Sequence, residues 1–322
     1  MPGDLLLMKT LKLLAFQIFN LAVKPLMGKG IGRFRPVGAV YRYLARHLIP
    51  KEKRLVYVNG YKMFVHTEEY KGIDGIAQQL LFQGTYERHT TILFKKLVSK
   101  GMNVIDIGAN IGYYTLLAAK LIGEKGKVFA FEPEPRNYAL LLRNIELNGY
   151  KNVIALQKAV SNKTGKVKLF LDRLEPGAHS LYKVREHATE AIAVDTISLD
   201  DFFKGKEFPI DVIKIDVEGA EMTILLGMTK IIKDNDNLKV FTEFWPPGLQ
   251  SSGFPAQEYW DKLVESGFKY IYLINEQKQR LEPANLTSMM RFCKSTFFRH
   301  PTSVNLLCAK APLGKRVIID TT

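Results

Sequence analysis

The sequence contains little cysteine and little histidine. Its 322 residues include two cysteines, Cys293 and Cys308, and six histidines. Two cysteines cannot build a disulfide framework, and no C-x-x-C pair or histidine cluster offers the ligands of a zinc site. We therefore predict no metal site, and a reducing, cytoplasmic compartment suits the chain best.

Long hydrophobic runs are missing as well. The most apolar stretch, residues 5–24, is too short and too polar to span a bilayer, which needs about 20 apolar residues. On a helical wheel, its lysines fall on one side. The other side carries Leu7, Met8, Leu11, Leu14, Ala15, Ile18, Phe19, Leu21 and Ala22. This pattern predicts an amphipathic helix that either lies on the inner face of the cell membrane or packs against the catalytic domain.

The central part of the chain lacks net charge. The formal net charge of +14 comes from the two ends: residues 1–60 hold 11 Lys and Arg against 2 acidic residues, and residues 291–322 hold 6 against 1. Residues 61–290 hold 29 of each sign. A nucleic-acid cleft needs clustered Lys and Arg to neutralise phosphates, so a nucleic-acid partner is disfavoured.

From about residue 102 onward, apolar strand-like segments alternate with helical ones. Strands are predicted at 103–107, 127–132, 152–160, 211–216, 238–244, 271–274 and 304–310, with two extra strands at 166–171 and 190–195. Helices are predicted at 111–121, 135–148 and 256–266, and from about 218. Such alternation favours a mostly parallel seven-stranded sheet with helices on both faces. An N-terminal extension and linker (1–55) would precede a domain at 56–322, which begins with a hairpin turning at Asn59-Gly60 and has its cofactor-binding core at about 84–245.

A glycine-rich turn connects the first of these strands to its helix. It reads Asp106-Ile-Gly108-Ala109-Asn110-Ile-Gly112. A dinucleotide site needs a second glycine where Asn110 stands, so that the backbone can approach the pyrophosphate. The carboxylate of Asp106 would repel that anion but suits the sulfonium and ammonium groups of S-adenosylmethionine. The turn therefore favours S-adenosylmethionine, and a nicotinamide-dependent oxidoreductase is the alternative.

Glu132 ends the second strand, 24 residues beyond Gly108. An acid at about this spacing can bind the ribose hydroxyls, although it can also cap the helix that follows. Because ligands bind at the carboxyl ends of parallel strands, residues 106–113, 132, 159–161 and 216–221 should converge. We accordingly expect Ala159 and Asp216 beside the cofactor.

Three carboxylates, Asp216, Glu218 and Glu221, follow the strand at 211–216, and Glu243 ends the next one. Glu221 suits a helix N-terminus, but that does not account for Asp216 at the end of a buried strand. An alcohol acceptor needs a general base, so Asp216 and Glu218 are the first candidates for catalysis and Glu243 is held in reserve. One of them could instead bind the methionine ammonium or a divalent metal.

Taken together, the segments GTYERHTTILF, IDIGANIGYYT, FEPEPRN, VDTISLDDF and IDVIKIDVEGAE resemble the FkbM family of methyltransferases over about residues 73–245. The resemblance implies a class I methyltransferase fold with S-adenosylmethionine as cofactor. It also implies that Asp106 to Gly112 and Glu132 hold the cofactor and that Lys214 to Gly219 line the site. Family members often O-methylate sugars or polyketide-type hydroxyls. We therefore expect O-methylation of a small-molecule, glycan or lipid-linked acceptor, with RNA methylation as the alternative.

Overall fold

A computed structural model describes residues 54–65, 75–172, 177–206, 208–294 and 303–314, together with Val317 and single positions between residues 11 and 43. The chain divides into two compact units. One consists of Met1–Tyr86 and Arg173–Gly177, and the other of Glu87–Asp172 and Ala178–Thr322. The second unit holds all of the residues predicted to carry the chemistry.

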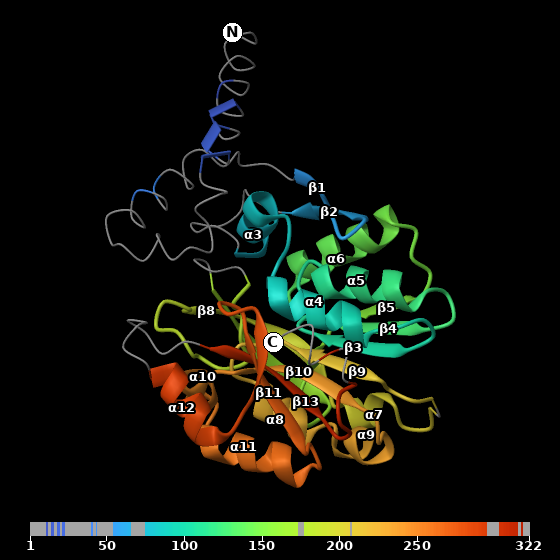
Figure 1. Ribbon diagram of the computed structural model, residues 1–322, viewed down its shortest axis with the longest axis vertical. Coiled ribbons are helices and arrows are strands. Elements are labelled where there is room, and N and C mark those ends of the chain that lie inside the picture. The colour runs from blue at the N-terminus through green and yellow to red at the C-terminus, as the bar shows by residue number, and fades with distance from the viewer. Residues whose placement is uncertain are drawn as a thin grey trace. The chain divides into compact units, whose positions relative to one another are not determined.

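The first unit contains the predicted hairpin. Strands β1 (Arg54–Val58) and β2 (Tyr61–Val65) pair antiparallel, and helix α3 (Gly75–Gln83) follows (Figure 1). Asn59 and Gly60 both have positive φ, at 52° and 79°, as a two-residue type I′ turn requires. Most of the extension at 1–55 lies outside the described residues, but the described positions from 11 to 22 are helical. In the described part of the chain, no helix has the length and apolarity to cross a bilayer.

The second unit is built on an eight-stranded sheet. Its strand order is β12 (Arg280–Pro283), β11 (Tyr270–Asn275), β13 (Val304–Ala309), β10 (Lys239–Phe244), β9 (Val212–Ile215), β3 (Asn103–Ile107), β4 (Lys127–Phe131) and β5 (Val153–Leu156). The pairs from β10 to β5 are parallel, whereas β13 runs antiparallel to both β10 and β11. All seven predicted strands take part, and this order is that of a class I methyltransferase fold. Strand β12, which the sequence reading missed, adds an antiparallel edge.

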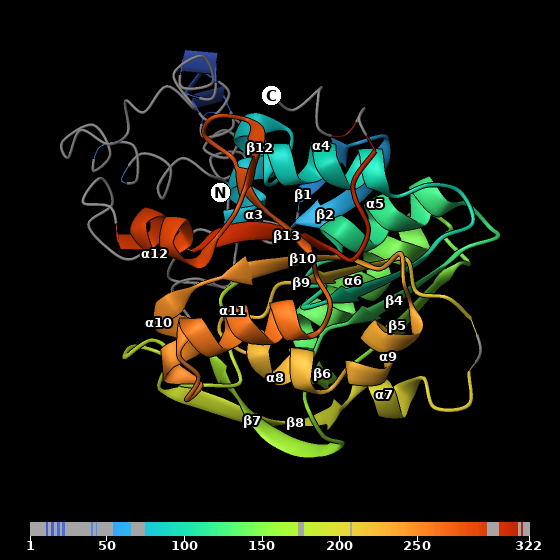
Figure 2. The ribbon, with the colours of Figure 1, turned by 60° about the horizontal axis from the view of Figure 1, so that its bottom comes forward.

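Helices cover both faces of this sheet, as predicted (Figures 1 and 2). One face carries α4 (Arg88–Leu97), α5 (Tyr113–Ile122) and α6 (Pro135–Leu147), and the other carries α8 (Glu221–Leu226), α9 (Thr229–Asp234) and α11 (Ala256–Glu265). Successive side chains along each strand point to opposite faces of the sheet and so contact opposite helix layers. Ile105 and Ile213 pack towards α8 and α11, whereas Asp106 and Lys214, which are register partners, face α4 and α5.

A separate three-stranded sheet corrects one prediction. The strand expected at 152–160 is two strands: β5 belongs to the large sheet, whereas β6 (Ala159–Val160) pairs with β8 (Glu190–Ile197). Strand β7 (Gly165–Leu171) completes the small sheet. The apolar run VIALQKAV is interrupted by Gln157 and Lys158, where the chain leaves one sheet and enters the other. The two extra strands predicted are therefore present, but they lie outside the main sheet.

Candidate active site

The strand order reverses between β3 and β9. From β3 the chain proceeds to β4 and β5 on one side, and it later builds β9 and β10 on the other. The crevice at such a switch point, at the carboxyl ends of the strands, is the usual ligand site of this architecture. The N–H of Asp216 donates to the carbonyl of Ile107 at 3.0 Å, so the loops that follow β3 and β9 are in contact. The predicted residues 106–113 and 216–221 thus converge.

The turn after β3 is held by hydrogen bonds and by close packing. The N–H groups of Gly108 and Ala109 both donate to the carbonyl of Phe131 at 3.0 Å. Gly108 has φ 77°, and a Cβ there would lie 1.9 Å from the carbonyl oxygen of Asp216. Asn110 also has positive φ, at 49°, a conformation that asparagine tolerates better than most residues. This backbone path, which ends at Gly112 before α5, requires the residue types that the sequence provides.

Glu132 stands at the end of β4 and faces this turn. Its Oε2 accepts the N–H of Asn110 at 2.7 Å, and its Oε1 accepts the N–H of Glu134 at 2.9 Å. Burial raises the pKa of Glu132 to about 8, although the two backbone donors lower it. Helix α6 is capped by Glu134, whose Oε2 accepts from Asn137, and not by Glu132. The capping alternative for Glu132 is therefore wrong, and its ribose role stays a prediction.

Ala159 is placed differently from the other predicted cofactor residues. It lies in β6 of the small sheet and packs in a buried cluster with Leu169, Leu171 and Val194. Its predicted place beside the cofactor stays a prediction, since the contacts described for it are structural.

Asp106 and Lys214 bring opposite charges together on the α5 side of the sheet. Thr115 donates to Asp106 Oδ2 at 2.5 Å, and Lys214 Nζ lies 3.0 Å from Asp216 Oδ2. Burial raises the pKa of Asp106 to about 6, whereas Thr115 and Lys214 lower it. Asp216 is the more accessible of the two acids, with 29% of its side chain exposed. It can therefore meet a ligand while it remains paired with a buried lysine.

Further carboxylates surround Asp216. Burial raises the pKa of Glu243 well above its ordinary value, and the carboxylates of Glu218, Asp216 and Glu221 raise it further. Burial raises the pKa of Glu221 to about 7. Within the described residues, Oε2 of Glu221 and Oε2 of Glu243 are buried without a hydrogen-bond partner. No group of His, Cys, Asp and Glu in the described ranges is arranged as a set of metal ligands.

Two residues on the connection between β7 and β8 contact this cluster, and of these the sequence did not indicate Arg185. Arg185, between β7 and β8, donates to Glu218 Oε2 at 3.1 Å, and its guanidinium lies 5.1 Å from the ring centre of Trp245. Ser180, on the same connection, donates to the carbonyl of Glu218 at 2.7 Å. Glu218 adopts φ 54° between these contacts. No spacing in the sequence indicates that Arg185 reaches the site.

The comparison with family models gives one match. Residues 106–270, just over half of the chain, match the Methyltransferase FkbM domain. The chain belongs to the FkbM methyltransferase family. The matched region is therefore a methyltransferase domain that uses S-adenosylmethionine, and the nicotinamide alternative finds no support in these matches.

Relatives of this FkbM-family chain cover parts of it. It is 32% identical over 130 residues to the hexuronic acid methyltransferase AglP of Haloferax volcanii, across 40% of this chain and 50% of that protein. It is 30% identical over 146 residues to methyltransferase 1 of Beauveria bassiana, across 39% of this chain and 57% of that protein. The chain thus spans about half the length of these curated relatives.

Solved structures resemble the FkbM-family chain more distantly. A methyltransferase FkbM from Methylobacillus flagellatus is 16% identical, with a TM-score of 0.39, over 66% of this chain and 43% of that one. The fibrillarin of Aeropyrum pernix, solved with natively bound S-adenosylmethionine, is 11% identical with a TM-score of 0.40, over 80% and 82%. The class I fold rests on the strand order and on the family match.

The residues present fit S-adenosylmethionine. Its ribose hydroxyls require acceptors and its cationic groups require carboxylates, and Glu132, Asp106 and Asp216 supply both at the switch point. The buried Oε2 atoms of Glu221 and Glu243, described above, leave acceptor capacity unused.

Proposed function

We propose that this methyltransferase O-methylates a hydroxyl of a sugar, a glycolipid or a related small acceptor. The observation that carries the proposal is the set of carboxylates at the ends of β9 and β10, namely Asp216, Glu218 and Glu243. S-adenosylmethionine supplies, when bound, a methyl group on a positively charged sulfur. A hydroxyl is a weak nucleophile until a proton leaves it, so a carboxylate base nearby serves this reaction.

The three acids differ in how well they suit the role of base. Asp216 is partly exposed and paired with Lys214 at 3.0 Å. Burial raises the pKa of Glu243 well above its ordinary value, which favours the protonated form that can donate a hydrogen bond. Glu218 is paired with Arg185 at 3.1 Å. Asp216 would therefore take the proton, while Glu243 would hold a neighbouring hydroxyl of the acceptor.

A sugar acceptor is supported by chemistry as well as by likeness. Carboxylates accept hydrogen bonds from hydroxyl groups, and the indole of Trp245 lies next to them on the loop after β10. One relative is named for methylation of hexuronic acid. The predicted small-molecule, glycan or lipid-linked acceptor is consistent with these features.

The decisive experiment uses the full-length protein, S-adenosylmethionine labelled in its methyl group, and a panel of hexoses, hexuronates, glycolipids and short RNAs. We expect label in a sugar, in a form that resists mild alkali because it is an ether. Asp216→Asn should lower turnover about 10²–10⁴-fold. Label in RNA, on nitrogen or in an alkali-labile ester would overturn the proposal, as would near-normal turnover by both Asp216→Asn and Glu218→Gln.

We further propose that residues 5–24 hold the enzyme on the cytoplasmic face of an anionic membrane, close to a lipid-linked acceptor. Four positions on the predicted apolar side, Leu11, Leu14, Ile18 and Leu21, are helical and between 53% and 74% exposed. The surrounding residues 1–60 carry a large excess of Lys and Arg. An exposed apolar stripe within a basic segment complements a lipid surface, where each basic residue contributes about 1 kcal/mol.

Vesicle flotation tests this second proposal. Full-length protein should float with vesicles of phosphatidylglycerol and phosphatidylcholine, less so at high salt, and a chain that starts at Lys29 should stay soluble and folded. If the shortened chain aggregates or melts far earlier and the full-length protein does not float, the segment packs on protein and the membrane proposal is wrong.

A further inference from the structure

Glu87 stands immediately before helix α4 but does not cap it. Its carbonyl accepts the N–H of Thr91 at 2.8 Å and so begins the helix, and its backbone is left-handed, with φ 40°. Its side chain makes no capping hydrogen bond. The carboxylate of Glu276, just after β11, accepts the N–H groups of His89 and Thr90 instead, both at 2.8 Å. A distant residue thus caps α4, and the carboxylate of Glu87 points elsewhere.

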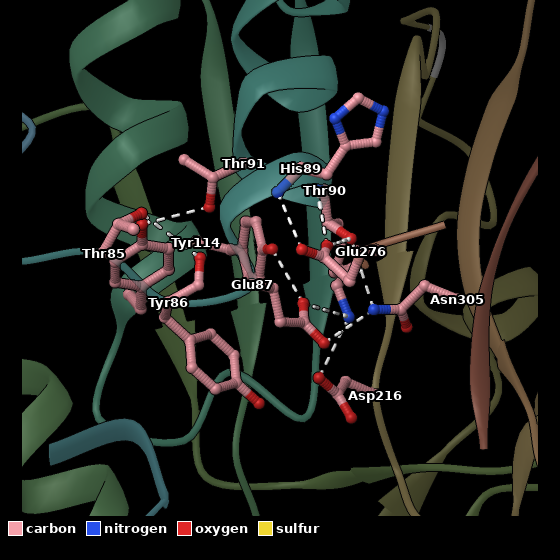
Figure 3. A network of polar contacts seen from close by, with 12 residues as sticks. Thr85, Tyr86, Glu87, His89, Thr90, Thr91, Tyr114, Asp216, Glu276 and Asn305 are labelled. Carbon is pink, nitrogen blue, oxygen red and sulfur yellow. Dashed lines mark hydrogen bonds and ion pairs between the residues drawn. The ribbon is translucent and has the colours of Figure 1, made fainter. Parts of the chain in front are cut away.

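That carboxylate points into the site described above (Figure 3). The hydroxyl of Tyr114 donates to Oε2 at 2.8 Å, and the amide of Asn305 donates to Oε1 at 2.7 Å. Lys214 Nζ lies 3.9 Å from Oε2. The three partners come from α5, β13 and β9, so the position of Glu87 is fixed by three separate elements. Only 17% of its side chain is exposed.

Lys214 connects Glu87 to Asp216. Its side chain is 1% exposed, and Nζ lies 3.0 Å from Asp216 Oδ2 and 5.1 Å from the ring centre of Tyr114. Burial lowers the pKa of Lys214, but the carboxylates of Asp216, Glu87 and Asp106 outweigh burial and raise it. One buried ammonium is therefore shared between two carboxylates, of which only Asp216 follows a strand into the predicted acceptor site.

We propose that Glu87 is a positioning residue for methyl transfer, which acts through Lys214 to set the direction and the basicity of the Asp216 carboxylate. This inference rests on the proposed function, in which Asp216 takes the proton of the acceptor. Because Lys214 also pairs with Glu87, it interacts less strongly with the Asp216 carboxylate than it would if Asp216 were its only partner. The left-handed backbone of Glu87 also suits a functional role, since such conformations persist where surrounding contacts enforce them.

Neutralising Glu87 should change the basicity of Asp216 in a definite direction. In Glu87→Gln, Lys214 interacts with Asp216 without competition, so the Asp216 carboxylate becomes easier to ionise and a weaker base. The other charged groups near Asp216, namely Asp106, Glu218, Glu221, Glu243 and Arg185, are unchanged in this variant.

The test is a titration of the full chain, labelled with ¹³C at the aspartate carboxyls and followed by NMR, with Asp216→Asn identifying the signal. Glu87→Gln should move the Asp216 titration to lower pH. The matched control is Glu276→Gln, which should lower the melting temperature through the α4 cap and leave the titration in place. An Asp216 titration that is the same in folded Glu87→Gln and in the unaltered protein would overturn the proposal.

Once the acceptor is known, kinetic measurements test the role of Glu87 independently. We expect Glu87→Gln to lower kcat about tenfold and to move the acidic limb of its pH profile downward, and Glu87→Asp to restore part of the rate. If Glu87→Gln does not fold, Tyr114→Phe, which removes one donor to Glu87, replaces it in the titration. Full turnover by Asp216→Asn would overturn the assignment of the base, whereas the titration still measures the connection between Glu87 and Asp216 without any acceptor.

Discussion

Two neighbouring acids after β4, Glu132 and Glu134, look alike in the sequence but have separate tasks. Glu134 caps α6 through the N–H of Asn137 at 2.7 Å. Glu132 instead reaches the glycine-rich turn, where it accepts the N–H of Asn110 at 2.7 Å. Their difference permits a paired test of the cofactor assignment, because both are buried and both are acidic.

Glu132→Ala should weaken binding of S-adenosylmethionine about 10²–10⁴-fold. Two hydrogen bonds that the ribose hydroxyls donate to the Glu132 carboxylate would be lost, each worth about 1.5–3 kcal/mol. Glu134→Ala is the control: it should cost about 1 kcal/mol of stability through the lost cap and leave the affinity nearly unchanged. Calorimetry decides, and unchanged affinity in a folded Glu132→Ala protein would remove Glu132 from the cofactor site.

Site residues could be predicted from the sequence only where they lie close to one another along the chain. Asp106, Gly108 and Asn110 form one turn, and a strand end fixes Glu132 relative to them. Glu87 could not be found in this way, because its partner Asn305 lies on β13, more than 200 residues away, and meets it only through the sheet. Arg185 was missed because the connection between β7 and β8 carries no periodic pattern.

Among the elements, the loops after β3 and β9 depend on each other. Gly108 has φ 77°, and a Cβ at this position would overlap the carbonyl of Asp216 at 1.9 Å. Gly123, at the end of α5, has the similar φ of 65° but nothing within 4 Å of its Cβ. The two glycines therefore separate the effect of backbone strain from the effect of contact between the loops.

Gly123→Ala forces an alanine to φ 65° and ψ −170°, a conformation almost confined to glycine, so it should cost about 1–3 kcal/mol of stability with cofactor affinity retained. Gly108→Ala also places an alanine at positive φ and must in addition displace the loop that holds Asp216. We expect it to destabilise the protein by more than Gly123→Ala and to abolish measurable cofactor binding. Denaturant melts and calorimetry on both variants check this, and equal behaviour of the two would show that the loops move independently.

Strands buried on both faces were predicted well, whereas short and edge strands were not. The segment NVIDI, apolar apart from Asn103 and Asp106, coincides with β3, and the run VIKI, apolar apart from Lys214, forms β9 within the predicted 211–216. Strand β12 has the sequence RLEP and only one buried residue, so it shows no apolar period. The break between β5 and β6 depends on which sheet each segment joins. Long-range contacts decide that pairing, and a run of apolar residues in the sequence does not indicate it.

At the scale of the whole molecule, the buried acids outweigh the buried bases in determining how stability depends on pH. Burial raises the pKa of Asp106 to about 6, that of Glu221 to about 7 and that of Glu132 to about 8. The pKa values of Glu87 and Glu243 are raised by burial as well, whereas burial of His89 lowers its pKa and acts in the opposite direction, as one group against five. The net charge of +14 comes from Lys and Arg, which stay protonated over this interval.

The unliganded protein should therefore lose stability as the pH rises from about 5 to 8. A carboxyl whose folded pKa lies above its unfolded value stabilises the fold fully below the unfolded pKa, and that contribution disappears as the pH passes the folded pKa. Urea melts at pH 5.5 and 8 measure the difference, and Glu221→Gln should reduce it. Affinity for S-adenosylmethionine should change in the opposite sense, rising with pH, because its sulfonium and ammonium favour ionised carboxylates. Stability and affinity that change in the same direction between pH 5.5 and 8 would show that these acids do not face the cofactor.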